Sequence, residues 1–219
     1  MRPFFISGIG TGIGKTFVAA LLTEVLKADY WKPVQAGFAE GTDSETVQQL
    51  STHPGMVIHP ETYRLKLPAS PHIAAREEGI RIDPDHILEH YGQFDNNRPL
   101  IIEGAGGLLV PLNESQTVID LILALKARLI LVSRNYLGSI NHSLLSAAVC
   151  RQREIDVAGW VFNDQFMNYE QEIAGWSGIP ALFSLPLLTE PSLESLKRAA
   201  ESIGPRVREM LFQDAAGRE

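Results

Sequence analysis

The chain has few of the features that mark secreted, disulfide-bonded or membrane-spanning proteins. It contains one cysteine, Cys150, which excludes a disulfide framework or a cysteine-based metal site within one chain. No apolar run reaches the roughly 18–20 residues that a membrane-spanning helix needs. Lysine and arginine number 19 against 26 aspartates and glutamates. The resulting net charge of −7 argues against a general nucleic-acid or anionic-membrane surface.

The composition is otherwise that of a globular protein. Hydrophobic residues make up 45% and charged residues 21% of the 219 residues, which is enough chain to bury a sizeable core. We expect a single domain over residues 1–219, with a frayed tail after Phe212. The first residues lead directly into a glycine-rich segment, so we expect no cleavable signal sequence and a cytoplasmic location.

Short apolar runs alternate with longer segments of helical periodicity. The apolar runs predict strands over residues 4–7, 30–33, 100–103, 129–133, 157–163 and 181–184. Helices are predicted over residues 16–27, 44–52, 71–78, 84–91, 117–126, 139–151, 169–177 and 193–210. Several strands are almost wholly apolar, as in parallel sheets covered on both faces. The pattern predicts a three-layer α/β fold with a mainly parallel central sheet flanked by helices.

The segment GIGTGIGKT, residues 8–16, lies between the first predicted strand and the first predicted helix. Its glycines would let backbone N–H groups approach an anion, toward which the helix would point its positive dipole end. Lys15 would add a charge near the β- and γ-phosphates, and Thr16 a hydroxyl for Mg²⁺. The loop has one extra residue, because Ile9 stands where a glycine is usual and the glycine lies at Gly8. These features predict a variant phosphate loop and a P-loop NTPase-like fold.

Three charged residues could complete a phosphoryl-transfer site. Glu103 ends an apolar strand, where its carboxylate could face Mg²⁺, or it could be an ordinary strand end before a flexible turn. Lys32, in WKPVQAG, could reach a transferring phosphoryl group or a reacting carboxylate, although a lone strand lysine is more often an edge or snorkelling residue. Asp43 could be a second metal carboxylate, but the local sequence favours Asp43 or Ser44 as a helix N-cap.

Three further segments lie where helices start or strands end. Ser70 and Pro71 open a helix, as a plain cap or as a helix start aimed at an anionic group. Residues 138–141 follow a strand and open a long helix, which makes them a second candidate anion site or an ordinary capped start. Asn163, at a strand end, could pair with the edge of a purine or could be a turn residue.

Eight segments, in order along the chain, resemble the ATP-dependent dethiobiotin synthetases between Phe4 and about Glu190. They are GIGTGIGKT, WKPVQAG, TDSE, SPHIAA, EGAGG, LGSINH, GWVFND and LPLLTEP. The resemblance implies a ligase of biotin biosynthesis that joins CO₂ to 7,8-diaminononanoate and closes a ring. One amine would form a carbamate, ATP would phosphorylate it to a carbamic-phosphoric anhydride, and the second amine would expel phosphate. ATP and Mg²⁺ would be the cofactors of a homodimer that contacts neither nucleic acid nor membrane.

The resemblance also implies roles for individual residues. The catalytic residues would be Lys15, Lys32 and Thr11. The nucleotide would be bound by Gly12, Ile13, Gly14, Lys15, Thr16, Phe17, Asn163, Pro186, Leu187, Leu188 and Glu190. Mg²⁺ would be held by Thr16, Asp43 and Glu103. The substrate would be bound by Lys32, Ala36, Ser70, Pro71, Gly106 and Gly107. Its carboxylate tail would be taken by Gly138, Ser139, Ile140 and Asn141 of the other subunit.

The chain departs from the family's usual pattern at two places that bear on binding. The family often has an acidic residue in the glycine loop, where this chain has Gly10 and Gly12, so backbone contacts must suffice there. The family often has Ser or Thr where this chain has Ala36, which removes a hydroxyl that would bond the carbamate. Losing one such contact costs about 1 kcal/mol, so Gln35 or water would have to replace it.

Three other functions remain to be weighed against this resemblance. Chromosome-partition switches share the fold but usually carry a lysine at the position of Gly10, and the acidic charge argues against DNA contact. Cobyrinate amidation enzymes typically carry a glutaminase domain with a nucleophilic cysteine, for which 219 residues leave no room. A relative that only binds nucleotide would not need the full set of lysines and carboxylates named above.

Overall fold

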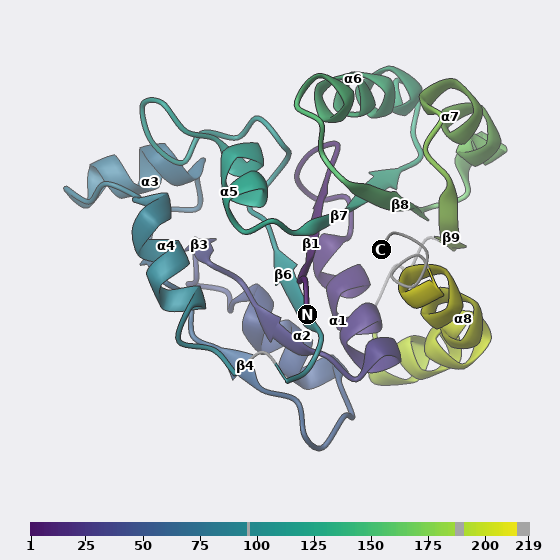
Figure 1. Cartoon of the computed structure of the whole chain (residues 1–219), viewed down its shortest axis with the longest axis horizontal. Helices are drawn as coiled ribbons and strands as arrows, with labels where there is room; N and C mark the ends of the chain where they lie inside the picture. The colour runs from purple at the N-terminus through teal and green to yellow at the C-terminus, as the bar shows by residue number, and fades with distance from the viewer. Residues whose placement is uncertain (96, 187–190, 214–219) are drawn as a thin grey trace.

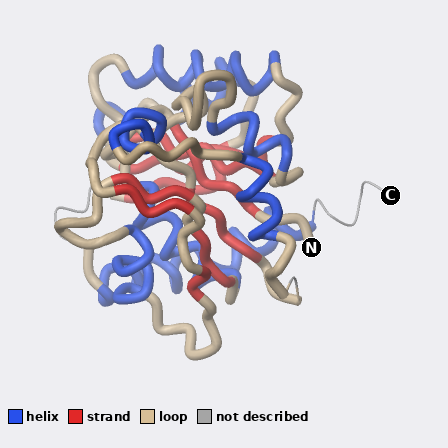
Figure 2. The backbone as a smooth tube through the Cα atoms, turned by 90° about the vertical axis from the view of Figure 1, so that its left-hand side faces the viewer, coloured by secondary structure: helices blue, strands red, loops and turns tan. Residues whose placement is uncertain are grey.

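The computed structural model describes residues 1–95, 97–186 and 191–213. Its centre is a seven-stranded sheet in the order β4-β2-β6-β1-β7-β8-β9, and all of its pairings are parallel. The strands are β1 Phe4–Gly8, β2 Asp29–Trp31, β4 Ile58–His59, β6 Leu100–Glu103, β7 Arg128–Arg134, β8 Val157–Asn163 and β9 Ala181–Leu185. Figure 2 shows helices on both sides of this sheet. The predicted three-layer α/β fold is confirmed.

All eight predicted helices are present, with ends shifted by a few residues at most. They are α1 Lys15–Leu26, α2 Asp43–Leu50, α3 Pro71–Glu77, α4 Pro84–Tyr91, α5 Val118–Ala124, α6 Ser139–Gln152, α7 Glu170–Ser177 and α8 Leu193–Gln213. A short 3₁₀ turn, Phe166–Asn168, precedes α7. Helices α1 to α7 lie in the connections between strands, as this class of fold requires, and α8 follows the last strand, β9 (Figure 1).

Two hydrophobic clusters hold the helices against the two faces of the sheet. Residues of α1, α2 and α8 join one cluster, and residues of α3 to α7 join the other. Neighbouring residues of β1 divide between them, because side chains alternate along a strand: Phe4 and Ile6 face the first cluster and Phe5 the second. The near-continuous apolar character of the central strands follows from this double coverage.

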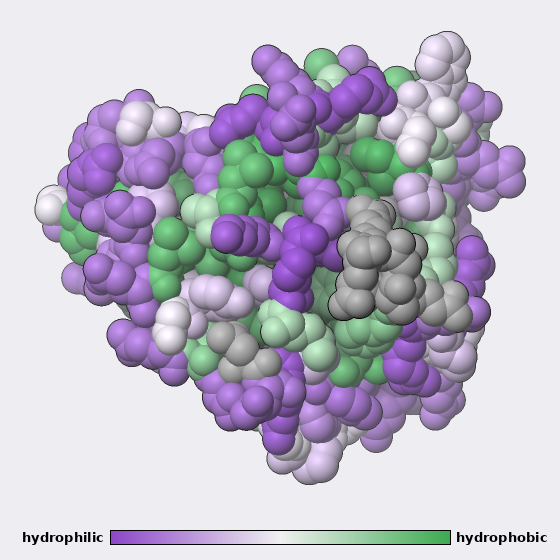
Figure 3. All heavy atoms as spheres, viewed as in Figure 1, coloured by the Kyte–Doolittle hydropathy of each residue, from purple (hydrophilic) through white to green (hydrophobic). Residues whose placement is uncertain are grey.

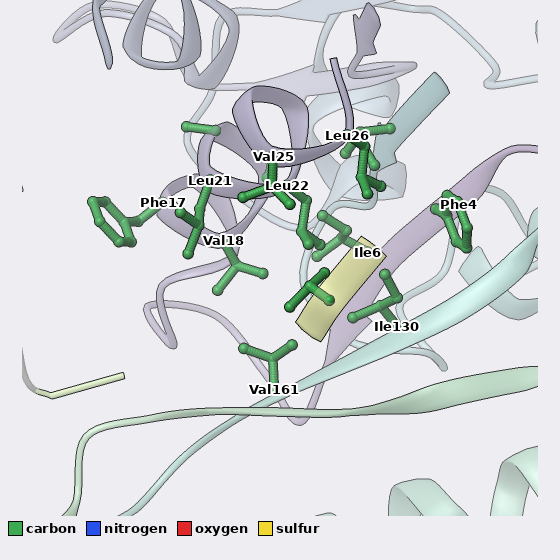
Figure 4. Packing of buried hydrophobic residues seen from close by; sticks show 14 of the residues in the cluster. Phe4, Ile6, Phe17, Val18, Leu21, Leu22, Val25, Leu26, Ile130 and Val161 are labelled. Carbon is green, nitrogen blue, oxygen red and sulfur yellow. The ribbon is translucent and has the colours of Figure 1, made fainter. Parts of the chain in front are cut away.

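Helix α1 is buried along almost its whole length. Figure 4 shows its apolar side chains, among them Leu21 and Leu22, packed toward Ile6, Ile130 and Val161 of the central strands. Each large side chain buried in this way stabilises the fold by about 1.5–3 kcal/mol relative to an exposed position. The start of α1, and the glycine loop that leads into it, are therefore fixed by the core.

Three short strands were not predicted from the sequence. They are β4 and two strands that form a separate parallel pair, β3 Val34–Ala36 and β5 Tyr63–Leu65. The strand predicted over residues 30–33 is shorter at its end, since β2 stops at Trp31 and the next strand, β3, begins only after Pro33. Proline lacks the N–H that a ladder needs, which accounts for the break. Lys32 consequently lies between two strands rather than inside one.

Within the described ranges, no helix is both long and apolar enough to cross a membrane. Of the tail after Phe212 only Gln213, the end of α8, is described, so the expected fraying falls outside the described residues. That residues 1–219 form a single domain stays a prediction.

Candidate active site

The glycine-rich segment forms a loop at the centre of the sheet's carboxyl edge. It follows β1, which pairs with β6 on one side and β7 on the other. Gly12 and Gly14 have φ values of 70° and 89°, in the left-handed region that glycine enters without steric cost. Gly14 is the N-cap of α1 and supplies no side-chain cap. The first N–H groups of α1 therefore lack a capping side chain, and such a helix start favours an anion.

Two side chains contact carbonyl groups of this loop. Lys15 Nζ donates to the carbonyl of Gly10 at 2.7 Å, and Asn163 Nδ2 donates to the carbonyl of Ile13 at 2.9 Å. Burial, only partly offset by the negative charge of Glu103, lowers the pKa of the Lys15 ammonium to about 8. Lys15 thus stands beside the loop as a poorly solvated cation that a phosphate would stabilise.

Four polar side chains meet beside the start of α1. Thr16 Oγ1 lies 2.7 Å from Asp43 Oδ1 and 3.0 Å from Glu103 Oε1. Lys32 Nζ forms an ion pair with Asp43 Oδ2 and lies 3.3 Å from Glu103 Oε1. These residues come from α1, α2, β6 and the β2–β3 connection. The fold alone brings them together, because up to 87 residues of chain separate the bonded partners.

The charges in this cluster stabilise one another, and two of the charged side chains are almost fully buried. Lys32 is 5% exposed and Glu103 is 1% exposed. Burial by itself would lower the pKa of Lys32, but attraction to Glu103 and Asp43 outweighs it and raises the pKa above its ordinary value. Burial likewise opposes ionisation of Asp43, yet Lys32 and Thr16 hold the pKa of that carboxyl below its usual range. The cluster therefore favours the charged forms of the Lys32 ammonium and the Asp43 carboxyl.

Sequence reasoning missed Tyr30, which contacts the same carboxylate from the interior. Its hydroxyl donates to Glu103 Oε2 at 2.9 Å, and its side chain is fully buried. Burial, together with the negative charge of Glu103, raises the pKa of Tyr30 well above its ordinary value, so the phenol keeps its proton. A tyrosine in an apolar strand is usual, and no local pattern distinguishes this one.

The donor set beside Thr16 fits a magnesium ion. Thr16, Asp43 and Glu103 supply one hydroxyl and two carboxylates, and Mg²⁺ prefers oxygen ligands of this kind. Mg²⁺ usually keeps waters and takes only one or two carboxylates, the rest coming from phosphates. Across the described ranges no group of three or more His, Cys, Asp and Glu side chains is arranged to hold a metal by itself. Thr16, Asp43 and Glu103 therefore fit a Mg²⁺ ion that takes its remaining ligands from a bound phosphate and water.

A cavity of about 790 Å³ joins the glycine loop to β3 and to the start of α3. Twelve of the predicted site residues line it: Thr11, Gly12, Gly14, Lys15, Thr16, Lys32, Ala36, Asp43, Ser70, Pro71, Glu103 and Gly106. Its other lining residues are Val34, Gln35, Pro68, Ala69, Ala105 and Val110. This volume is in the usual range for a small-molecule site. The glycine loop and a second, more apolar side thus share one cavity.

The prediction that Asp43 or Ser44 caps α2 is wrong. Thr42 is the N-cap: its side chain accepts from the Glu45 N–H at 3.1 Å, and the Glu45 carboxylate accepts from the Thr42 N–H at 2.9 Å. Thr42 and Glu45 have the spacing of a capping box, which satisfies the helix start without Asp43. Asp43 is the first helical residue, and its carboxylate contacts Thr16 and Lys32 instead.

The start of α3 matches its prediction in position but not in bonding. Ser70 is the N-cap and Pro71 follows it, yet the Ser70 hydroxyl makes no capping bond. It lies 3.0 Å from His72 Nδ1, and both Ser70 and Pro71 line the cavity.

Several predicted binding residues lie away from the cavity. The side chains of Ile13 and Phe17 are part of the core, and Pro186 is exposed just after β9. Neither they nor Asn163 line the cavity. Leu187, Leu188 and Glu190 lie outside the described residues. The purine-binding side of the predicted site therefore stays a prediction.

The predicted tail-binding residues also lie outside this cavity. Gly138, with a φ of 106°, is the N-cap of α6, and none of residues 138–141 lines the cavity. Gly107 instead lines a second, mainly apolar groove of about 400 Å³. Its lining residues come from the glycine loop, from residues 107–111 and from α6.

In Figure 3 hydrophilic side chains cover most of the face viewed in Figure 1, while hydrophobic ones gather around the position of α5.

Comparison with curated proteins identifies relatives over most of the chain. A family model described as an AAA domain matches residues 2–195. The ATP-dependent dethiobiotin synthetase BioD of Cytophaga hutchinsonii is 53% identical over 164 residues, which cover 74% of this chain and 77% of that protein. The protein of the same name from Agrobacterium fabrum is 47% identical over 197 residues, covering 90% and 91%.

Comparison with solved structures agrees on the fold. A ParA family ATPase from Chlorobium tepidum aligns with a TM-score of 0.57 at 15% identity, covering 99% of this chain and 100% of that one. The septum site-determining protein MinD of Pyrococcus horikoshii, complexed with Mg-ADP, aligns with a TM-score of 0.58 at 14% identity, covering 98% and 97%. At such identities the likeness shows the P-loop NTPase fold alone. The curated relatives decide the family: the chain belongs to the ATP-dependent dethiobiotin synthetases.

Proposed function

We propose that this chain is a dethiobiotin synthetase, which uses ATP to join CO₂ to 7,8-diaminononanoate and to close the ureido ring. One observation carries the proposal. Lys15, Thr16, Lys32, Asp43 and Glu103 line one cavity in a chain of this family. The lysines suit anionic oxygens, and the cavity has room beside the glycine loop for a second small molecule.

The triphosphate of ATP lies, in this proposal, along Gly12 and Gly14 at the start of α1. The backbone N–H groups there and the helix dipole favour the negative charge. Lys15 would exchange its neutral acceptor, the Gly10 carbonyl, for the β- and γ-phosphate oxygens. Hydrogen bonds to charged acceptors are roughly twice as strong as those to neutral ones, so this exchange favours the bound state.

The first chemical steps place negative charge next to Lys32. An amine adds to CO₂ and loses a proton to form a carbamate. A carbamate oxygen then attacks the γ-phosphorus while the bond to ADP breaks. Phosphoryl transfer depends mainly on positioning and on stabilising charge. Lys32, held charged by Asp43 and Glu103, would neutralise the carbamate and γ-phosphoryl oxygens.

Mg²⁺ is part of the proposal as a second source of positive charge. Thr16, Asp43 and Glu103 would hold it, and when bound it would neutralise charge on the β- and γ-phosphate oxygens. Thr16 has a fixed place in this set, because it is the second residue of the buried helix α1.

Ring closure follows when the second amine attacks the carbonyl carbon of the carbamic-phosphoric anhydride and phosphate leaves. The cavity wall formed by Val34, Ala36 and Val110 suits the alkyl chain of the substrate. The amide of Gln35 donates to the Gly37 carbonyl at 2.8 Å, so it is already engaged on the protein side. We therefore expect Lys32 or water to take the contact that Ala36 cannot make.

We also propose a homodimer in which residues 138–141 bind the carboxylate tail of a substrate held by the other subunit. The support is their position, since they start a long helix yet lie outside the cavity of their own chain. The apolar groove beside them has exposed Leu109 and Leu145 in its walls and reaches the glycine loop. A second copy seated there would lie next to both sites. The enzyme would work in the cytoplasm, where ATP is present.

The proposed reaction is tested by incubating the pure protein with ATP, Mg²⁺, bicarbonate and 7,8-diaminononanoate. Mass spectrometry should find dethiobiotin formed in step with ADP. Omitting the diamine should stop ADP formation. Release of ADP without dethiobiotin would support the nucleotide site but contradict the proposed substrate. If neither ADP nor dethiobiotin formed, the proposed reaction as a whole would be contradicted.

A further inference from the structure

The two oxygens of Glu103 have separate partners. Oε1 faces the cavity side of the carboxylate, 3.0 Å from Thr16 Oγ1 and 3.3 Å from Lys32 Nζ. Oε2 faces inward and accepts the hydroxyl of Tyr30 at 2.9 Å. Tyr30 and Glu103 lie on β2 and β6, which pair directly in the sheet. A rigid strand thus presents the hydroxyl to the carboxylate.

This contact fixes a torsion that is otherwise soft. The terminal torsion of a glutamate side chain has a broad distribution, unlike the staggered torsions nearer the backbone. Glu103 is 1% exposed, so bulk water cannot replace a lost partner of Oε2. Without the Tyr30 hydroxyl, Oε2 would be a buried acceptor lacking its donor, and the carboxylate would rotate to share the donors on its other side.

Asp43 is oriented by different means. It is the first residue of α2, whose start is fixed by the capping box of Thr42 and Glu45, and its two oxygens contact Thr16 and Lys32. Both of its partners therefore belong to the cavity cluster. Of the two carboxylates beside Thr16, only Glu103 depends on a buried donor that is not itself at the cavity.

We propose that Tyr30 is a positioning residue for the metal-binding carboxylate of Glu103. It holds Oε2 so that Oε1 stays directed at Thr16 and at the place proposed for Mg²⁺. The inference rests on the proposed function for the role of Mg²⁺. Partners of metal-ligating carboxylates typically change metal affinity 10- to 100-fold when they are removed, which sets the expected size of the effect.

The test compares Mn²⁺ binding by the parent, Tyr30→Phe and Thr23→Val in the presence of ADP, followed by electron paramagnetic resonance. Tyr30→Phe deletes one oxygen and keeps the buried ring. Thr23→Val is the control, because it deletes a fully buried hydroxyl that has no hydrogen-bond partner in the part of the chain that the structure describes. We expect the Kd for Mn²⁺ to rise tenfold or more in Tyr30→Phe and to stay unchanged in Thr23→Val. A Tyr30→Phe value within threefold of the parent overturns the proposal.

A double variant separates positioning from a general structural effect. In a Glu103→Gln background the carboxylate that Tyr30 orients is already gone, so Tyr30→Phe should weaken Mn²⁺ binding no further. An equal additional loss in that background would mean that Tyr30 acts on the site by another route, and would overturn the proposal.

A second measurement follows Tyr30 in the parent protein and therefore does not depend on whether a Tyr30 variant folds. Among the five tyrosines, all of them described, Tyr30 alone is buried. In protein labelled with 3-fluorotyrosine, its fluorine resonance is the one that a soluble relaxation agent leaves sharp. Adding Mg²⁺ and ADP should shift this resonance, and an unmoved resonance under saturating Mg²⁺ would overturn the proposal. None of these measurements requires turnover. If the parent protein made no dethiobiotin, the proposed reaction would be contradicted, but the role of Tyr30 could still be tested by metal binding.

Discussion

The side-chain amide of Asn163 donates a hydrogen bond to the backbone carbonyl of Ile13, which lies 150 residues earlier, at 2.9 Å. This bond ties the end of β8 to the glycine loop. It is possible because Gly14 has no side chain: a Cβ there would lie 1.9 Å from Asn163 Nδ2. The φ of 89° at Gly14 also disfavours every other residue type.

Replacing Gly14 with alanine should disrupt the loop for both reasons. We expect Gly14→Ala to lower the free energy of unfolding by about 1–3 kcal/mol and to remove measurable ATP binding. Gly10→Ala is the matched control, since a Cβ at Gly10 would meet, apart from its chain neighbours, no atom of the described residues within 4 Å. Thermal melting and calorimetric titration with a non-hydrolysable ATP analogue would measure both effects. Equal behaviour of the two variants would contradict the packing described here.

Lys15→Ala should nearly abolish turnover in a protein that still folds. Removing a charge that stabilises the transition state typically lowers kcat by about 10²–10³. Lys66→Ala, which removes an exposed lysine, should leave kcat unchanged. The measurement is the rate of dethiobiotin formation at saturating substrate concentrations, and circular dichroism checks that each variant is folded. Turnover of Lys15→Ala within threefold of the parent would refute the role of this ammonium.

ATP affinity should fall as the pH rises above neutrality. The pKa of Lys15 is lowered to about 8 in the free protein, so the ammonium is charged at pH 7 and mostly neutral at pH 9. Phosphates stabilise only the charged form, which means that binding weakens as the proton is lost. The dissociation constant of a non-hydrolysable ATP analogue, measured from pH 7 to 9, should therefore increase. In Lys15→Arg, whose guanidinium stays charged, the increase should vanish. A flat profile in the parent would contradict the prediction.

A charge placed in the apolar groove should split the proposed dimer. Leu145 on α6 is 58% exposed and lines the groove. We expect Leu145→Glu to sediment as a monomer and to lose most of its turnover, because residues 138–141 could then no longer reach the partner's substrate. Val57→Glu is the control, since Val57 is 46% exposed and lies beside β4 at the far edge of the sheet. An active Leu145→Glu monomer would show that one chain suffices.

The parts of the site that the sequence predicted are those with a local pattern. The glycine loop and the strand end at Glu103 could be located because an apolar strand precedes each of them. Asp43 was ambiguous, since the nearby capping box of Thr42 and Glu45 competes with any metal-binding interpretation of an acidic residue at a helix start.

The rest depends on contacts between distant segments. Tyr30 and Glu103 are 73 residues apart, and nothing near either residue indicates the bond between them. Strand β3, which carries part of the cavity wall, and its partner β5 have three residues each and are too short to show a periodicity. Only the folded chain shows that Lys32 sits between two carboxylates rather than at a sheet edge.

The most direct test of the proposed chemistry follows an oxygen atom from CO₂. If a carbamate oxygen attacks the γ-phosphorus and ring closure then breaks the bond between carbon and that oxygen, the released phosphate must carry it. The reaction should be run with ¹³C- and ¹⁸O-labelled bicarbonate in unlabelled water. It should be stopped before the ¹⁸O of the bicarbonate exchanges with the oxygen of water. Mass spectrometry should find ¹³C in the ureido carbon of dethiobiotin and one ¹⁸O in each phosphate. Dethiobiotin formed together with unlabelled phosphate would contradict phosphorylation of a carbamate.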